Sequence, residues 1–167
     1  MTRSNVVAVQ PPPESAISDW YANPDLLGSF AIRLPPDAPC DARLLARRML
    51  ETLPAWVRML MALRDVVMSK AGVATSSDLR AATEGKDRIG FFPVVYHAQK
   101  EIVLGYEDQH LDFRTSILIV YETDGNLLIS TTAVRCHNLL GRIYIRTIQP
   151  FHVAIVRNGL RRSAAKP

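Results

Sequence analysis

The hydrophobic pattern changes period along the chain, from helical spacing in the second quarter to strand-like alternation in the third. Residues 29–34 form the first predicted strand, which a proline-rich segment ends. Asp41 is a candidate N-cap, and the apolar positions after it recur at helical spacing, which predicts a short amphipathic helix. Pro54 interrupts this pattern, and a second helix is predicted over 55–71, with Gly72 as its C-terminal stop.

The third quarter of the chain predicts an antiparallel meander. Residues 89–97 and 102–106 are rich in β-branched and aromatic side chains, which indicates a hairpin. Residues 111–121 alternate between apolar and polar, and 127–136 form the next strand. The Asp124-Gly125 pair between these two strands is typical of a two-residue hairpin turn. The pattern therefore predicts four strands between the helix pair and the last quarter of the chain.

The last quarter fits two interpretations. Residues 142–148 contain enough β-branched residues for a strand, but apolar residues recur every three or four positions through the whole segment. We therefore predict one long helix, capped by Asn138 and ending at 158–159, with a kink at Pro150. His152 lies beside this kink and is expected to be structural or solvated.

The order of these elements predicts an α+β fold. A strand, two shorter helices, an antiparallel meander and a long C-terminal helix together resemble the helix-grip fold, in which a curved antiparallel sheet wraps the last helix. We expect residues 1–27 to form a partly extended or flexible N-terminal arm, 28–162 a single helix-grip-like domain, and 163–167 a flexible tail.

Three local motifs resemble one family. They are Pro54-Ala-Trp-Val-Arg-Met-Leu-Met-Ala-Leu-Arg-Asp65, Gly105-Tyr-Glu-Asp-Gln-His-Leu-Asp-Phe-Arg114, and His137-Asn-Leu-Leu-Gly-Arg-Ile-Tyr144 with Pro150-Phe-His152. They are similar to the uncharacterised bacterial family called domain of unknown function 2867 (DUF2867), over roughly 29–162. The resemblance implies a fold of the helix-grip type, also called SRPBCC or START-like. That type includes lipid and hormone carriers, polyketide cyclases and dehydratases, and accessory domains of oxygenases. It carries over no catalytic residue.

Composition excludes several classes of protein. With 167 residues, of which 48% are hydrophobic and 22% charged, the chain fits one globular domain with its own core. No apolar run reaches the length of a membrane span, and the first residues lack the apolar core of a signal peptide, so we expect a cytoplasmic protein. The net charge of +4 is spread along the chain without a nucleic-acid-binding motif, so no nucleic-acid partner is expected. No cofactor fingerprint occurs, and a homo-oligomer is compatible with the sequence.

The sharpest polar pattern is Asp108, His110, Asp112 and Arg114, spaced by two. If the strand begins at Asp108, all four side chains point to one side, and His110 becomes a candidate general base oriented by Asp108 or Asp112. The same residues could hold a divalent metal. A two-residue turn would place Asp112 opposite His137 and Arg114 opposite Arg135, a like-charge pair that indicates a bulge or a bound anion. A solvated strand face is the ordinary alternative.

The apolar face of the same strands predicts a ligand-binding wall, because it mixes apolar area with hydroxyl groups. In the simplest register Phe113, Thr115, Ile117 and Ile119 face Cys136, Val134, Thr132 and Ser130, with the last helix as the opposing wall. The candidate ligand-binding residues are Phe113, Thr115, Ile117, Ser130, Thr132, Tyr144 and Phe151. We expect the protein to bind a small hydrophobic or amphipathic molecule between the sheet and the last helix. The alternatives are an ordinary core, a cyclase-, dehydratase- or hydrolase-like enzyme using His110, and a protein-interaction module without a ligand.

Overall fold

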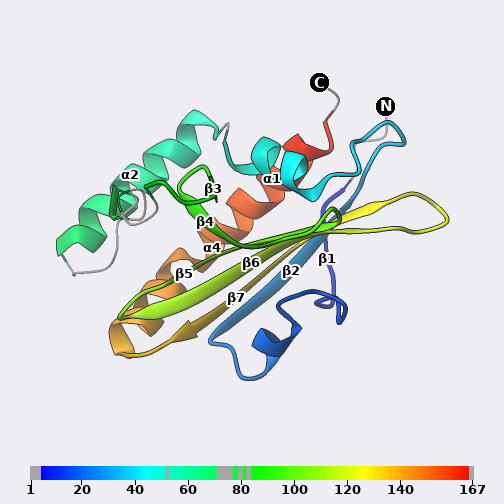
Figure 1. Ribbon diagram of the computed structural model, residues 1–167. Coiled ribbons are helices and arrows are strands. Elements are labelled where there is room, and N and C mark those ends of the chain that lie inside the picture. The colour runs from blue at the N-terminus through cyan, green and yellow to red at the C-terminus, as the bar shows by residue number, and fades with distance from the viewer. Residues whose placement is uncertain (1–4, 52, 71–76, 79–80, 82–83, 166–167) are drawn as a thin grey trace.

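The computed structural model describes residues 5–51, 53–70, 77–78, 81 and 84–165 (Figure 1). Within these residues the fold is α+β, with a seven-stranded antiparallel sheet and a long C-terminal helix, which fits a helix-grip arrangement. The strand order is β1-β2-β7-β6-β5-β4-β3. The elements are β1 Val7–Ala8, the 3-10 helix η1 Ser18–Tyr21, β2 Leu26–Arg33, α1 Ala42–Leu50, α2 Ala55–Lys70, β3 Arg88–Ile89, β4 Phe92–His97, β5 Glu101–Glu107, β6 Leu111–Val120, β7 Leu127–Cys136 and α4 Leu139–Ser163.

The two shorter helices begin where the sequence predicts. The Asp41 side chain caps α1 by accepting hydrogen bonds from the backbone N–H groups of Arg43, at 2.8 Å, and Leu44, at 3.2 Å. The second helix, α2, begins at Ala55, directly after Pro54. The predicted stop at Gly72 lies outside the described residues.

The strands differ from the prediction in two places. The predicted strand 89–97 is divided into β3 and β4, because the chain turns at Gly90 with a φ of +62°, which glycine adopts readily. The predicted two-residue turn at Asp124-Gly125 is wrong, since Val120 pairs with Leu127 across a six-residue loop. This loop is centred one residue earlier than the predicted turn, and the β6–β7 register is therefore displaced by two positions. An even displacement keeps every side chain on its predicted face of the sheet.

The last helix is capped by Asn138, as predicted, whose side-chain oxygen accepts a hydrogen bond of 3.0 Å from Gly141 N–H. It runs on to Ser163, past the predicted end at 158–159. Gly159 serves close packing instead of ending the helix, because a Cβ there would lie only 2.5 Å from Met49 Cγ in α1.

The two faces of the sheet have different covers (Figure 1). One face packs against α1 and α4, with α4 running along β2 and β7. The opposite face is covered in part by the N-terminal segment that follows β1, residues 9–22, which contains η1. We call these the helix face and the N-terminal face. In the part of the chain that the structure describes, no helix is long and apolar enough to cross a membrane. The cytoplasmic location stays a prediction.

The N-terminal segment is anchored by a buried carboxylate. Glu101, only 4% exposed, accepts hydrogen bonds of 2.6 Å from the Ser15 hydroxyl and 2.5 Å from the Ser116 hydroxyl. Both of its oxygens also accept from the backbone N–H of Ala16. Three donors around one carboxylate satisfy a charge that burial alone would disfavour. The segment is therefore fastened to β5 and β6 at this point.

Candidate functional site

Two hydrophobic clusters lie between the sheet and α4, and polar residues of the sheet separate them. One cluster contains Ile117 and Leu128 of the sheet, packed with Val156 and Leu160 of α4 and with α1. The other surrounds Tyr144 at the beginning of α4. The helix face of β7 between them carries Ser130 and Thr132. These polar positions form the floor of the candidate site.

The hydroxyl groups on this floor are unequally satisfied. Thr132 lies opposite Thr115 on β6, and their hydroxyl oxygens are 3.1 Å apart. Ser130 lies opposite Ile117 and is 1% exposed, yet its Oγ has no hydrogen-bond partner. A buried hydroxyl without a partner costs about 1–3 kcal/mol. Ser130 is therefore the polar group for which a ligand would provide the missing partner.

The part of α4 that contains His152 passes over Ser130 and Thr132. Because Tyr144 belongs to one cluster and Val156 to the other, the intervening helical segment, with His152, passes over the polar positions of β7. Burial lowers the pKa of His152 to about 4, so its imidazole is neutral at physiological pH. A neutral imidazole presents one donor and one acceptor.

Gly28 of β2 adjoins this floor and is partly exposed. Gly28 pairs with Thr132, and a Cβ built at Gly28 would have one neighbour within 4 Å, the Phe30 ring at 3.6 Å. Phe30 is paired with Ser130 and carries the Arg157 guanidinium of α4 over its ring, 5.3 Å from the centroid. The Nε of Arg157 is buried without a hydrogen-bond partner. A second unsatisfied polar group thus lies at the β2 side of the floor.

The predicted ligand-binding residues occupy different environments. Phe113, Thr115, Ile117, Ser130 and Thr132 share the helix face of β6 and β7. Tyr144 is buried in the cluster at the beginning of α4. Phe151 is 48% exposed and does not form part of the buried wall. The geometry brings six of the seven to the space between sheet and helix. Their role as ligand contacts stays a prediction.

The predicted catalytic residues do not share one strand face. The strand β6 begins at Leu111, and Asp108 and His110 lie in the turn before it. The His110 Nδ1 is 2.9 Å from the side-chain nitrogen of Asn138, the cap of α4. Asp108 N–H donates to Asp112 Oδ1 at 3.2 Å. The alternation expected from Asp108 onward is wrong because the β5–β6 turn uses these residues to reverse the chain.

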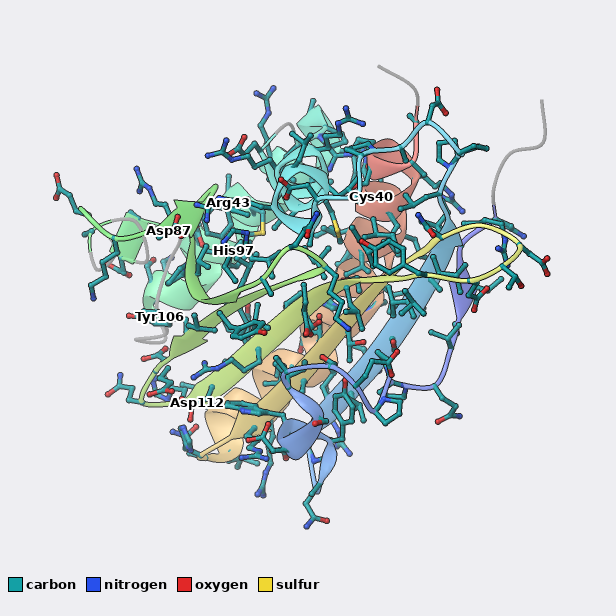
Figure 2. The ribbon with its side chains drawn as sticks, turned by 45° about the vertical axis from the view of Figure 1, so that its right-hand side comes forward. Cys40, Arg43, Asp87, His97, Tyr106 and Asp112 are labelled. Carbon is teal, nitrogen blue, oxygen red and sulfur yellow. The ribbon has the colours of Figure 1, made fainter. Side chains whose placement is uncertain are left out.

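The carboxylate–imidazole pair that does form is Asp112 with His137. Asp112 lies at the end of the sheet where α4 begins (Figure 2). His137 Nε2 is 3.0 Å from its Oδ2. The residue opposite Asp112 in the ladder is Arg135, so His137 reaches the carboxylate from two positions further along the chain. Asp112 alternates with the residues of the helix face, and it therefore lies on the N-terminal face.

Arg114 and Arg135, the predicted like-charge pair, both lie over one aromatic ring. Arg114 lies opposite Ala133, not Arg135, because of the displaced register. Both guanidinium groups lie over the Trp20 ring of η1, at 4.7 and 4.6 Å from its centroid. Arg114 also forms an ion pair of 2.6 Å with Glu107. Neither a bulge nor an anion is needed to explain the two arginines.

A separate hollow of about 240 Å³ lies between the first turns of α4 and Asp25, the residue before β2. It is lined by Asp25, Leu139, Arg142, Ile143, Ile145 and Arg146. The hollow has two cationic side chains, Arg142 and Arg146. Arg142 already forms an ion pair with Asp25 at 3.4 Å. The volume is below the range of about 300–1,000 Å³ that is usual for small-molecule sites.

Among the residues that the structure describes, no group of three or more His, Cys, Asp or Glu is arranged to hold a metal ion. The predicted cluster at Asp108, His110 and Asp112 is thus not supported as a metal centre. Cys40 and Cys136 are both free thiols. Burial, with the nearby Asp25 carboxylate, raises the pKa of the Cys136 thiol and keeps it protonated.

Sequence reasoning missed Gly28, Arg157 and the burial of His152. The first two had weak signals: a glycine next to the predicted first strand and an arginine within an otherwise apolar helical turn. Their joint position depends on how α4 crosses β2, which is a long-range contact.

The comparisons with known proteins give one match. The model of a family described as a protein of unknown function (DUF2867) matches residues 20–159, which include the end of η1, the sheet from β2 onward and most of α4. No curated protein and no solved structure shows a significant match to the chain.

Proposed function

The chain belongs to the DUF2867 family, which has no assigned activity, and from its geometry we propose that it binds a small amphipathic molecule between the sheet and α4. The ligand would lie on the helix face of β6 and β7, in contact with Phe113, Thr115, Ile117, Ser130 and Thr132. Its apolar part would pack on the aromatic and aliphatic side chains, and its polar part would meet the hydroxyl groups.

The observation that carries this proposal is the buried Ser130 hydroxyl without a partner. Evolved cores satisfy nearly all of their buried polar groups. The neighbouring strand β2 carries Gly28, where side-chain atoms are sparse, and α4 carries the neutral His152. A ligand with its own hydrogen-bonding group would supply the partner that Ser130 lacks.

Native mass spectrometry tests this proposal. The protein purified from cells is measured before and after denaturation, and again after addition of decanoic acid. We expect a mass excess, from the cellular ligand or from decanoic acid, that disappears on unfolding. A bare protein mass in both samples contradicts the proposal.

A matched pair of variants locates the bound molecule. Thr132→Val removes a hydroxyl from the helix face, and Thr131→Val removes one from the N-terminal face, where Thr131 bonds Ser29 at 2.8 Å. Valine keeps the shape of threonine in both variants. Occupancy should fall only in Thr132→Val. Equal loss in the two variants contradicts a site between the sheet and α4.

An enzymatic function is the alternative, and the Asp112–His137 pair is the observation that favours it. A carboxylate that orients an imidazole is the arrangement of a general base. This pair replaces the predicted combination of His110 with Asp108 or Asp112. It lies on the N-terminal face, however, and a ligand held between the sheet and α4 would not reach it. Binding without catalysis therefore accounts for more of the structure.

A protein-interaction module is the remaining alternative. It is favoured by α2, where Trp56, Met59 and Val66 are exposed apolar residues. Light scattering coupled to size-exclusion chromatography distinguishes this reading, because self-association through α2 would give a mass above that of the monomer.

A further inference from the structure

Resting on the proposed function, we infer that the ligand is an anionic amphiphile, whose acidic head group binds Arg157 at the β2 edge while its apolar chain lies along the helix face of the sheet.

The Arg157 guanidinium is partly buried and is not fully hydrogen-bonded. Its Nε is buried and lacks a hydrogen-bond partner. Among the described residues, no acidic side chain forms an ion pair with it, whereas Arg33, Arg43, Arg47, Arg114 and Arg142 each have one. A partly buried cation without a counter-ion is costly unless a ligand supplies the charge.

The Arg157 guanidinium lies over the Phe30 ring, near Ser130. The Phe30 ring lies against the guanidinium and holds it in place, and the N–H donors of a guanidinium point along its plane and can meet a carboxylate. Phe30 pairs with Ser130, so the ring under the Arg157 guanidinium of α4 lies opposite the unsatisfied Ser130 hydroxyl across β2 and β7. A carboxylate accepts from both an arginine N–H and a serine hydroxyl.

A ligand would reach this site beside Gly28. Gly28 lies two residues before Phe30 on the same face of β2. β1 pairs with Phe30 and Ala31, and Val9 N–H donates to the Ser29 carbonyl oxygen at 3.0 Å, so the pairing along this edge reaches the residue next to Gly28. A Cβ at Gly28 would have one neighbour within 4 Å, so side-chain atoms are sparse there. An apolar chain could enter there and extend toward Thr132 and Thr115, with its head group left at Arg157.

Calorimetric titration with two probes of equal chain length, decanoic acid and 1-decanol, tests the inference at neutral pH. The acid is charged and the alcohol is neutral. We expect wild-type protein to bind the acid more tightly. Arg157→Gln should weaken binding of the acid by about tenfold to a hundredfold, the usual effect of removing a hydrogen bond to a charged group. It should change binding of the alcohol less than about twofold.

Two arginine variants provide controls. Arg161→Gln removes an exposed charge from the same helix and should leave both affinities unchanged. Arg146→Gln changes the hollow at the beginning of α4. An equal loss of acid binding in Arg146→Gln and Arg157→Gln overturns the inference, since the head group would then not be specific to Arg157.

The outcomes separate the two claims. Equal affinity of wild-type protein for acid and alcohol overturns the anionic head group but keeps the proposed binding function. Failure of both probes to bind contradicts the proposed function itself. Gly28→Leu tests the entrance independently of charge, because its side chain would fill the space beside Phe30. It should weaken both probes more than tenfold, and unchanged binding in a folded Gly28→Leu protein overturns entry at this edge.

Discussion

The hydroxyl oxygens of Thr115 and Thr132 lie 3.1 Å apart across β6 and β7, on the sheet face that α4 covers. Each threonine can therefore satisfy the other. Ser130, two residues from Thr132 on the same face, lacks such a partner. The contrast between a satisfied pair and an unsatisfied neighbour is the basis of the first prediction.

Ser130→Ala should stabilise the ligand-free protein. The substitution removes a buried oxygen without a partner, and the gain should be about 1–2 kcal/mol in the free energy of unfolding. Ser116→Ala is the matched control, because this serine is equally buried but donates to Glu101. It should destabilise by a similar amount. Urea unfolding measures both, and a loss of stability in Ser130→Ala would show that this hydroxyl is satisfied.

Glu101→Ala should loosen the N-terminal segment. It leaves the Ser15 and Ser116 hydroxyls and the Ala16 N–H without their acceptor, at a cost of about 3 kcal/mol or more. Limited proteolysis should then cleave the chain before β2 faster than in the wild type. Arg33→Ala, which removes an exposed ion pair with Glu122, is the control and should cost less than about 1 kcal/mol. Equal proteolysis of both variants would refute the anchoring role.

Gly141→Ala should destabilise much more than Gly28→Ala. A Cβ at Gly141 would lie 2.3 Å from the His110 backbone oxygen, which cannot move without disturbing the β5–β6 turn. We expect a loss of about 2–3 kcal/mol. At Gly28 the same methyl group meets only Phe30, at an ordinary contact distance, so stability should be kept. Thermal unfolding compares the two variants, and similar melting temperatures would contradict the close contact at Gly141.

Burial of His152 should make stability depend on pH. Its pKa is about 4 in the folded protein and near 6.5 when unfolded, so the unfolded state binds the extra proton between these values. Stability from this residue is complete above pH 6.5 and falls as the pH decreases toward 4. The loss is at most about 3 kcal/mol, because the side chain keeps some contact with solvent. Urea unfolding measured between pH 4 and 6.5 should show that the free energy of unfolding depends less on pH in His152→Gln than in the wild type. The same pH dependence in His152→Gln and wild type would contradict a buried, neutral His152.

Local signals predicted the helices well. Asp41 and Asn138 cap α1 and α4 as expected, since capping depends on residues a few positions apart. The end of α4 could not be predicted from Gly159. Glycine is common after helices, but here it allows Met49 of another helix to approach.

The faces of β6 and β7 could be predicted, but their register could not. Alternation alone assigns each residue to a face, whereas the register depends on which residues lie at the centre of the turn. Asp124-Gly125 favours a two-residue turn, yet the chain closes a longer loop from Tyr121 to Asn126. The predicted pairing partners were therefore wrong, while the face assignments of Thr115 and Thr132 were correct.

The environment of the polar residues depended on contacts distant in sequence. Nothing near Arg114 or Arg135 indicates that Trp20 would lie between the sheet and solvent at that point. The proximity of Asp112 and His137 was predicted, but from a register that is wrong, because Asp112 lies opposite Arg135 and His137 reaches it from two positions further along the chain. Such placements require the assembled fold.

The most direct test of ligand binding between the sheet and α4 is a methyl NMR titration with decanoic acid. Protein labelled at threonine and isoleucine methyl groups reports on both faces of the sheet at once. We predict that the signals of Thr115, Thr132 and Ile117 on the helix face shift with increasing decanoic acid, while those of Thr131 and Ile129 on the N-terminal face do not. Shifts confined to the N-terminal face, or no shifts at all, would contradict the account.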